Sequence, residues 1–278
     1  MGDTRGDGGP ESHDKYLTYS SYLRLDDLLS IQVEKSGDGD EPAEHDEMLF
    51  IIIHQVYELW FKQVLHELDY VRERLARGDL PRVLHSMKRI LTILKVLVAQ
   101  LDILETMTPL DFLAFRVRLA EASGLQSYQF RELEFLLGNK REEVFDRYPT
   151  GSDARARIER RFGEPTLWDA VLGFLDASGY PMPASALERD VTRPIEPSPE
   201  VQVELIRLYR SDPQLVPLCE RLIDLDEGLQ EWRYRHVKMV ERTIGSKHGT
   251  GGTTGAPYLA TSLNRPIFPD LWAIRTSL

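Results

Sequence analysis

The sequence predicts an all-α protein that folds as a single domain. Over most of the chain, apolar side chains recur at steps of three and four residues, which is the spacing of one face of an α-helix. No run of alternating apolar and polar residues, typical of strands, is present, and no internal repeat is visible. The chain has 278 residues, of which 42% are hydrophobic, so it can build one large core.

The N-terminal region is expected to hold a tail, a short helical segment and a loop. Residues 1–14 are rich in Gly and Asp and almost without large apolar groups, which predicts a disordered tail. Residues 16–32 carry apolar groups at mixed helical spacings, which predicts one helix or two short ones. The acidic stretch 34–47 is expected to be a mobile loop. The helical domain is therefore taken to span residues 15–278.

Three strong helices are expected next. Residues 46–77 and residues 81–106 each carry a continuous apolar stripe. Thr108 is expected to cap a third helix, with Pro109 at its first position, because both residue types favour these places. This helix is expected to end near Ser123–Gly124.

The rest of the chain continues with helical periodicity. Further helices are expected at about residues 127–137, 166–178, 199–209 and 213–244. Gly245 is expected to terminate the last of these, and the C-terminal tail holds a further apolar turn or two. Residues 149–197 are richer in Pro, Gly and Ser and give little other information.

Charge and composition exclude several classes of protein. The net charge of −11 argues against binding to nucleic-acid phosphates or to an anionic membrane. The lone Cys219 rules out a disulfide within the chain and a thiolate metal cluster. The N-terminus has no apolar core of a secretory signal, and no apolar run reaches the roughly 20 residues needed to span a bilayer. We therefore expect a cytoplasmic protein.

His236 lies in an apolar row of the helix 213–244. The row follows alternating steps of four and three residues and consists of Leu218, Leu222, Leu225, Leu229, Trp232, His236 and Met239. A histidine in such a row points into the core, where its ring nitrogens need partners. Spacing alone leaves two interpretations open: a core histidine bonded to a backbone or carboxylate group, or an iron ligand.

His54 presents the same question on the helix 46–77. It lies one helical turn from Phe50 and Tyr57 and two turns from Phe61. Aromatic faces around one hydrogen-bonding ring suit a flat ligand with one polar edge. An ordinary buried histidine is the alternative.

Other common chemistries do not fit the motif spacings. The sequence lacks the second histidine of HExxH, the CxxCH motif of covalent haem, and GxSxG. The glycine-rich loop 249–255 has neither of the phosphate-binding glycine spacings, and a helix precedes it instead of a strand. Cys219 neighbours the apolar row and is expected to pack as a small hydrophobic residue.

Several segments resemble the tryptophan 2,3-dioxygenases, in the family's order and at its separations between about residues 17 and 261. They are LTYSSYLRLDDLLSIQ (17–32), FIIIHQVYELWFKQ (50–63), TPLDFLAFR (108–116), ASGLQSYQFRELE (122–134), WRYRHVKMVERTIG (232–245) and GTGGTTG (249–255). Six matching segments in the same order and at the same separations make the resemblance specific to this family. Residues 149–197 show the least of it.

The resemblance implies a helical bundle that encloses one haem b per subunit, held without a covalent bond and ferrous in the active state. The implied reaction inserts O2 across the indole C2–C3 bond of L-tryptophan and yields N-formyl-L-kynurenine, the first step of tryptophan breakdown by the kynurenine route. The resemblance also implies a homotetramer.

Site residues follow from the same resemblance. His236 matches the axial iron ligand, and His54 matches the distal histidine beside the indole nitrogen, which we interpret as positioning first and a base second. Phe50 matches the aromatic residue that packs the indole. Arg116 matches the residue that binds the substrate carboxylate, and Thr250 matches a threonine of a closing loop that contacts the ammonium and carboxylate groups.

Two further groups of positions match the family. The pocket-lining positions are Leu119, Ser123 and Gly124. The positions that in the family reach a neighbouring subunit's active site are Tyr19, Tyr22 and Leu23. Several relatives carry Tyr where this chain has Phe112, so a hydrogen bond to the substrate carboxylate is absent here. This difference leaves Arg116 and Thr250 with more of the anchoring.

Two other functions compete with the dioxygenase. A haem-binding sensor or carrier would need no amino-acid clamp such as Arg116 and Thr250. A helical scaffold without a cofactor would leave His54 and His236 as unexplained polar groups in apolar rows.

Overall fold

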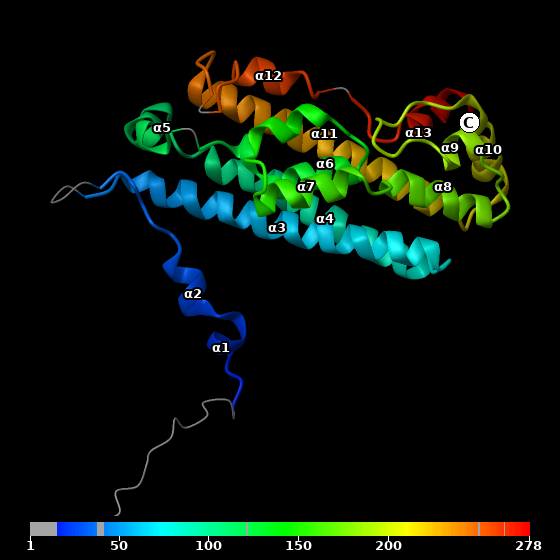
Figure 1. The fold of residues 1–278 in the computed structure, drawn as a ribbon, viewed down its shortest axis with the longest axis horizontal. Coiled ribbons are helices and arrows are strands. Elements are labelled where there is room, and N and C mark those ends of the chain that lie inside the picture. The colour runs from blue at the N-terminus through cyan, green and yellow to red at the C-terminus, as the bar shows by residue number, and fades with distance from the viewer. Residues whose placement is uncertain (1–15, 38–41, 121, 250, 264) are drawn as a thin grey trace, which may run out of the picture.

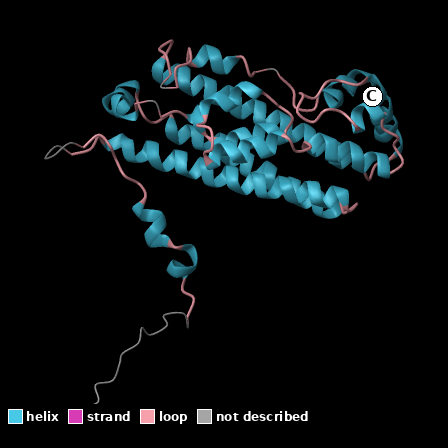
Figure 2. Cartoon of the chain, in the orientation of Figure 1, coloured by secondary structure: helices cyan, strands magenta, loops and turns pink. Residues whose placement is uncertain are grey.

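The computed structural model describes residues 16–37, 42–120, 122–249, 251–263 and 265–278. Every regular element in these ranges is a helix (Figure 2), so the prediction of an all-α chain is confirmed for them. The tail predicted for residues 1–14 lies outside the described residues. The division into this tail and one domain from residue 15 onward therefore stays a prediction.

Three long helices form the body of the molecule. They are α3 (His45–Ala76), α4 (Leu80–Leu104) and α11 (Val216–Ile244), and they run lengthwise beside one another (Figure 1). Helix α4 packs against both α3 and α11. Their apolar stripes meet in one large core, in which Leu68, Met87 and Leu222 are fully buried. The predicted bounds of these helices are correct to within about three residues, including the stop at Gly245, where φ is +61°.

The chain turns sharply after α5 (Pro109–Arg116). Thr108 caps this helix as predicted, because its side chain accepts a hydrogen bond from the backbone N–H of Asp111. The prediction that the helix continues to Ser123–Gly124 is wrong. A 3-10 turn follows at Val117–Leu119, and Ala120 takes a positive φ of 48°, which an α-helix cannot accommodate.

A second short turn leads into α6. Ser123 accepts a hydrogen bond from the backbone N–H of Leu125 and so caps the 3-10 turn Gly124–Gln126. Ser127 then caps α6 (Tyr128–Leu136), the helix predicted at about residues 127–137. These capped turns hold the segment 123–127 beside the body of the protein.

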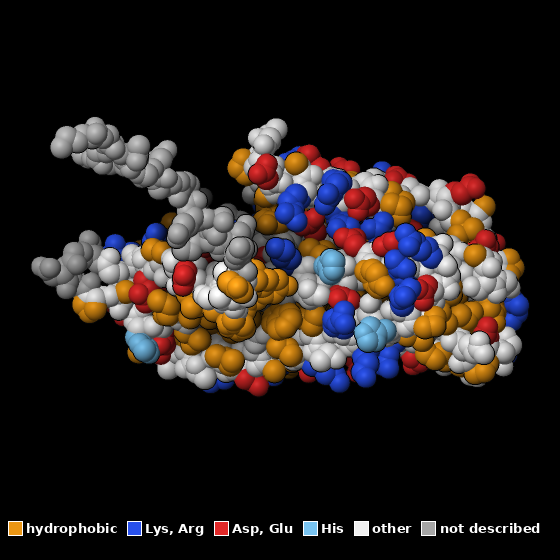
Figure 3. Space-filling view, turned by 90° about the horizontal axis from the view of Figure 1, so that it is seen from below, with side chains coloured by type: hydrophobic (Ala, Val, Ile, Leu, Met, Phe, Trp, Pro, Cys, Tyr) orange, Lys and Arg blue, Asp and Glu red, His pale blue; other side chains and the backbone are white. Residues whose placement is uncertain are grey.

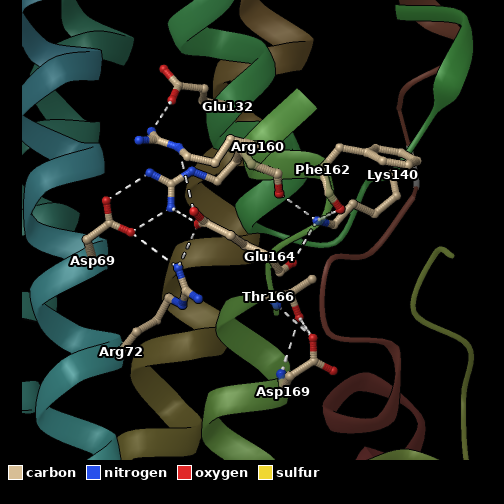
Figure 4. Close-up of polar contacts among 10 residues, drawn as sticks. Asp69, Arg72, Glu132, Lys140, Arg160, Phe162, Glu164, Thr166 and Asp169 are labelled. Atoms are coloured by element: carbon tan, nitrogen blue, oxygen red, sulfur yellow. Dashed lines mark hydrogen bonds and ion pairs between the residues drawn. The ribbon is translucent and has the colours of Figure 1, made fainter. Parts of the chain in front are cut away.

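Helix α7 (Asp153–Phe162) was not predicted, whereas α8 (Leu167–Ala177) was. Polar contacts fasten α7 to the body (Figure 4). The guanidinium of Arg161 donates to both carboxylate oxygens of Asp69 on α3, at 2.7 and 2.8 Å. The ammonium of Lys140 donates to the carbonyls of Arg161, Phe162 and Glu164 at 2.7–2.9 Å, which satisfies the C-terminal end of α7.

The remaining helices cover the ends of the body. They are α9 (Ala184–Leu187), α10 (Pro199–Ser211), α12 (Ala256–Ala260), α13 (Pro269–Ala273) and the 3-10 turns Glu142–Arg147 and Ile274–Ser277. Buried Asp226 of α11 fastens the C-terminal segment. Its carboxylate accepts from the backbone N–H groups of Ile267 and Phe268, at 2.7 and 3.1 Å, and from the indole of Trp272 at 2.9 Å.

An N-terminal arm projects from the body (Figure 1). It consists of α1 (Tyr19–Leu23) and α2 (Leu25–Ser30), so the two-helix version of the prediction is correct. The break between them is Arg24, whose φ is +52°. None of the residues in either helix is buried, and hydrophobic side chains gather on the face from which the arm projects (Figure 3).

The base of the arm is fastened to α3. The buried carboxylate of Glu47 accepts hydrogen bonds from the backbone N–H groups of Lys35 and Ser36, each at 2.8 Å. The side chain of Gln32 donates to that of Gln55 at 2.6 Å. Within the described ranges, no helix is both long and apolar enough to cross a membrane.

Candidate active site

A cavity of about 310 Å³ lies between α3, α4, α5, α6, α11 and the segment that follows α11. This volume is in the range of sites for small molecules. Much of its wall is apolar and comes from Phe50, Tyr57, Phe61, Leu101, Leu104, Met107, Phe130, Trp232 and Val237. Both histidines singled out in the sequence border it.

His236 lies on the inner side of α11, as the apolar row predicted, and borders the cavity there. Its imidazole stacks on the indole of Trp232 one turn earlier, with ring centroids 5.2 Å apart and ring planes 4° apart. No hydrogen bond joins the imidazole to another described residue. Burial, and to a lesser degree the nearby His54, lowers the pKa of His236 to about 4, so the ring is neutral at physiological pH.

His54 enters from α3, and a hydrogen bond fixes its tautomer. Its Nδ1 lies 2.6 Å from the backbone carbonyl of Phe50, which can only accept, so Nδ1 donates. Burial lowers the pKa of His54 and favours the neutral ring, in which Nε2 is then an acceptor. The ring of Phe50 lies beside the imidazole, with centroids 4.1 Å apart.

Arg116 and Phe112 also border the cavity, both from α5. The guanidinium of Arg116 donates to the backbone carbonyl of His248, in the loop that follows α11. The phenyl ring of Phe112 packs 5.8 Å from that of Phe50 and offers no hydrogen-bonding group. Thr250, predicted for the same loop, lies outside the described residues.

The loop after α11 touches the turn at Ser123. Ser123 and Gly124 border the cavity, as expected. Gly251 approaches so closely that a Cβ there would lie 2.6 Å from the hydroxyl oxygen of Ser123. Leu119, in contrast, packs against the hydrophobic core and does not border the cavity.

The three predicted arm residues lie away from this cavity. Tyr19 and Tyr22 are 77% and 70% exposed, and Leu23 is 41% exposed. Within one chain they do not contribute to the site, and a role in a neighbouring subunit stays a prediction.

Some residues of the cavity were not predicted. They are one aromatic residue and five charged residues: Phe130, Glu58, Arg131, Glu134, Arg141 and Arg233. Tyr57, which the sequence placed one turn from His54, does border the cavity. Arg233, three residues before His236, gives no comparable signal because a lone arginine on a helix is usually exposed.

Known proteins match this chain over most of its length. The chain matches the family described as tryptophan 2,3-dioxygenase over residues 5–175 and 201–278. A tryptophan 2,3-dioxygenase of Herpetosiphon aurantiacus is 56% identical over 262 residues, which cover 94% of this chain and 98% of that protein. One from Anaeromyxobacter sp. is 53% identical, over 97% of this chain and 99% of that protein. A tryptophan 2,3-dioxygenase of Caulobacter vibrioides is 43% identical, over 94% of this chain and 98% of that protein.

Proposed function

The chain belongs to the tryptophan 2,3-dioxygenase family, and from this premise we propose the reaction that it catalyses. It inserts both atoms of O2 across the indole C2–C3 bond of L-tryptophan and yields N-formyl-L-kynurenine, so it is a dioxygenase of tryptophan catabolism. The observation that carries the proposal is the pair of histidines, His54 and His236, which border one cavity from two different helices.

The cavity suits haem b, which we propose as one ferrous group per subunit. His236 would hold the iron, since its imidazole is neutral and has no hydrogen-bond partner among the described residues. Aromatic and aliphatic walls would pack the porphyrin. When bound, the haem supplies the O2 chemistry, while the protein supplies position and electrostatics.

His54 is suited to orient the indole. Because Nδ1 donates to the Phe50 carbonyl, Nε2 remains free to accept a hydrogen bond from the indole N–H. The Phe50 ring, beside this imidazole, offers an apolar face for the flat ring of the substrate. We therefore propose that His54 positions the substrate first and acts as a base second.

Arg116 is suited to bind the substrate carboxylate. A guanidinium can make two parallel, charge-assisted hydrogen bonds to a carboxylate, a geometry that Lys cannot reproduce. In the structure this guanidinium donates to the carbonyl of His248, so the substrate would share or replace a contact with the loop. Phe112 adds no polar contact, and we propose that Thr250 of this loop completes the binding of the carboxylate and ammonium.

We also propose a homotetramer in which the arm completes a neighbour's site. The exposed Tyr19, Tyr22 and Leu23 support this arrangement, since large apolar groups on a projecting segment usually have a partner. Leu119 is assigned to the pocket only by the resemblance to the family, since it does not border the cavity of this chain. The cytoplasmic location expected from the sequence stays a prediction.

One assay tests the proposal against its alternatives. The purified protein is loaded with haem, reduced, and mixed with L-tryptophan and O2, while the Soret band and the absorbance of N-formyl-L-kynurenine are followed. The proposal requires both signals. A Soret band without product would indicate a haem sensor or carrier, and absence of both signals would indicate a scaffold; either result would overturn the proposed reaction.

A further inference from the structure

A group of charged side chains from α6, α11 and the segment after α6 borders the cavity. Its centre is the carboxylate of Glu134 on α6, which accepts from the guanidinium of Arg131 and, at 2.8 Å, from that of Arg141. Arg233 of α11 lies 3.8 Å from the same carboxylate. Glu134, Arg131 and Arg233 are all at least nine-tenths buried. Three guanidinium groups therefore share one carboxylate inside the protein.

The positive charges of the cavity wall exceed the negative charges by two. Arg116 and the three arginines just described border the cavity, and the carboxylates that border it are those of Glu58 and Glu134. A zwitterionic amino acid in the cavity would not change this balance. The surplus charge is costly in a buried site unless an anion compensates for it.

Unused hydrogen-bond donors point to the same conclusion. The Nε–H groups of Arg131 and Arg141 are buried and have no partner within the described ranges. The guanidinium of Arg131 also lies against the ring of Phe130, 5.0 Å from its centroid, which limits its freedom to turn toward water. Buried donors without partners are rare in folded proteins and call for an explanation, and those of Arg131 and Arg141 border a cavity that can hold a bound group.

We propose that Arg131, Arg141 and Arg233 form the site for the two carboxylates of the haem, its propionate groups. This inference rests on the proposed function, because it takes haem as the ligand. Two carboxylates carry the two negative charges that the cavity wall lacks, and guanidinium groups bind carboxylates well. Arg233 and His236 are three residues apart on α11 and border the same cavity, so one helix supplies both the iron ligand and an anion ligand.

The test compares haem with haem dimethyl ester, which lacks the carboxylate charges. The full-length apoprotein is titrated with each compound, and the dissociation constant is read from the Soret band. Wild-type protein is expected to bind haem about tenfold or more tightly than the ester. Arg233→Met should weaken haem binding by a similar factor and leave ester binding nearly unchanged. Arg141 is less buried than Arg233, so Arg141→Met serves as a second test if the Arg233→Met variant does not fold.

Arg235→Met is the matched control. Arg235 lies on the same helix but pairs with Asp102 at 2.6 Å, away from the cavity, so it should leave both affinities unchanged. Equal affinity of wild-type protein for haem and ester, or equal weakening of both in the Met variants, would overturn the carboxylate site. That result would leave the proposed function standing as long as the haem-loaded protein still forms product. A protein that binds neither compound would overturn both proposals.

Discussion

The imidazole of His236 lies parallel to the indole of Trp232, with 5.2 Å between ring centroids and 4° between ring planes. Trp232 is fixed in turn by aromatic neighbours: the rings of Phe130 and Phe61 lie 5.2 and 6.4 Å from it. The stacked rings therefore restrict the rotation of the imidazole before any ligand arrives. Such preorganisation would lower the entropic cost of binding the haem iron.

We predict that His236→Ala abolishes stable haem binding while the apoprotein keeps its helical fold. The substitution removes the imidazole that we propose as the iron ligand. Haem titration followed by the Soret band, together with far-ultraviolet circular dichroism, checks both parts. His66→Ala is the control, since His66 is exposed on α3 and does not border the cavity. A normal Soret band in His236→Ala would exclude His236 as the ligand.

We predict that Arg116→Lys raises the KM for L-tryptophan and leaves the haem content unchanged. Lys keeps the charge but cannot form the paired hydrogen bonds, a loss of about 1.5–3 kcal/mol or roughly ten- to hundredfold in affinity. Steady-state kinetics measure the change. Arg118→Lys serves as the control because Arg118 is exposed two residues later. A KM for Arg116→Lys within twofold of wild type would mean that this residue does not bind the carboxylate.

The strongest helices were predictable because their stabilisation is visible in the sequence. In α3, α4 and α11 the apolar side chains that fill the core recur at regular steps. Helix α7 lacked this signal, since Arg161 replaces an apolar residue on its buried side. Its burial is compensated by the carboxylates of Glu164 and of Asp69, which is distant in the sequence.

The site was predictable to a similar extent and for a similar reason. His54 and His236 stand out because they interrupt apolar rows, and the resemblance to the family supplied the positions of Arg116 and Phe50. The charged group around Glu134 could not be recognised, because it depends on side chains of α6 and α11 meeting at the cavity wall. The early end of α5 depends on the positive φ at Ala120, a residue type that gives no sign of it.

We predict that His54→Ala slows turnover without abolishing it and weakens the preference for indoles with a free N–H. In wild-type protein the Nε2 acceptor of His54 should favour L-tryptophan over its 1-methyl analogue, which has no N–H to donate. The measurement is kcat/KM for both substrates in both proteins. Equal selectivity in the two proteins would show that His54 does not contact that nitrogen.

We predict that Glu47→Gln loosens the base of the arm at neutral pH. Burial acts to raise the pKa of Glu47, but hydrogen bonds from Ser36 and Lys35 outweigh it, so the pKa in the folded protein lies below the ordinary value of 4.5. The carboxylate therefore stabilises the fold above about pH 4.5, and this contribution is lost as the pH falls through the folded-state pKa.

Hydrogen exchange of the Lys35 and Ser36 amides checks the Glu47 prediction. These amides should exchange faster in Glu47→Gln than in wild type at pH 7, and the difference should shrink as the pH falls below about 4.5. Glu44→Gln, at an exposed neighbouring position, should behave as wild type. Unchanged exchange in Glu47→Gln would show that this carboxylate does not hold the arm.

We predict that deletion of residues 1–30 leaves haem bound but removes most of the activity. The deletion removes α1 and α2, whose residues contribute nothing to the buried core of their own chain, so the bundle should still fold. The loss of activity would then be caused by the absence of Tyr19, Tyr22 and Leu23 from the active site of the neighbouring subunit. Haem content, size-exclusion chromatography with light scattering, and steady-state kinetics measure the three properties separately.

A mixing experiment distinguishes a shared site from a merely destabilised chain. The truncated protein keeps its own cavity residues but lacks the arm, whereas full-length Arg116→Ala keeps the arm but lacks the carboxylate ligand. When the two are refolded together, mixed assemblies should regain part of the turnover, because the arm of one subunit can complete the intact cavity of the other. Each protein refolded alone is the control and should stay nearly inactive. A truncated protein that is fully active as a monomer would overturn the shared site, because no arm would then be needed to complete the cavity.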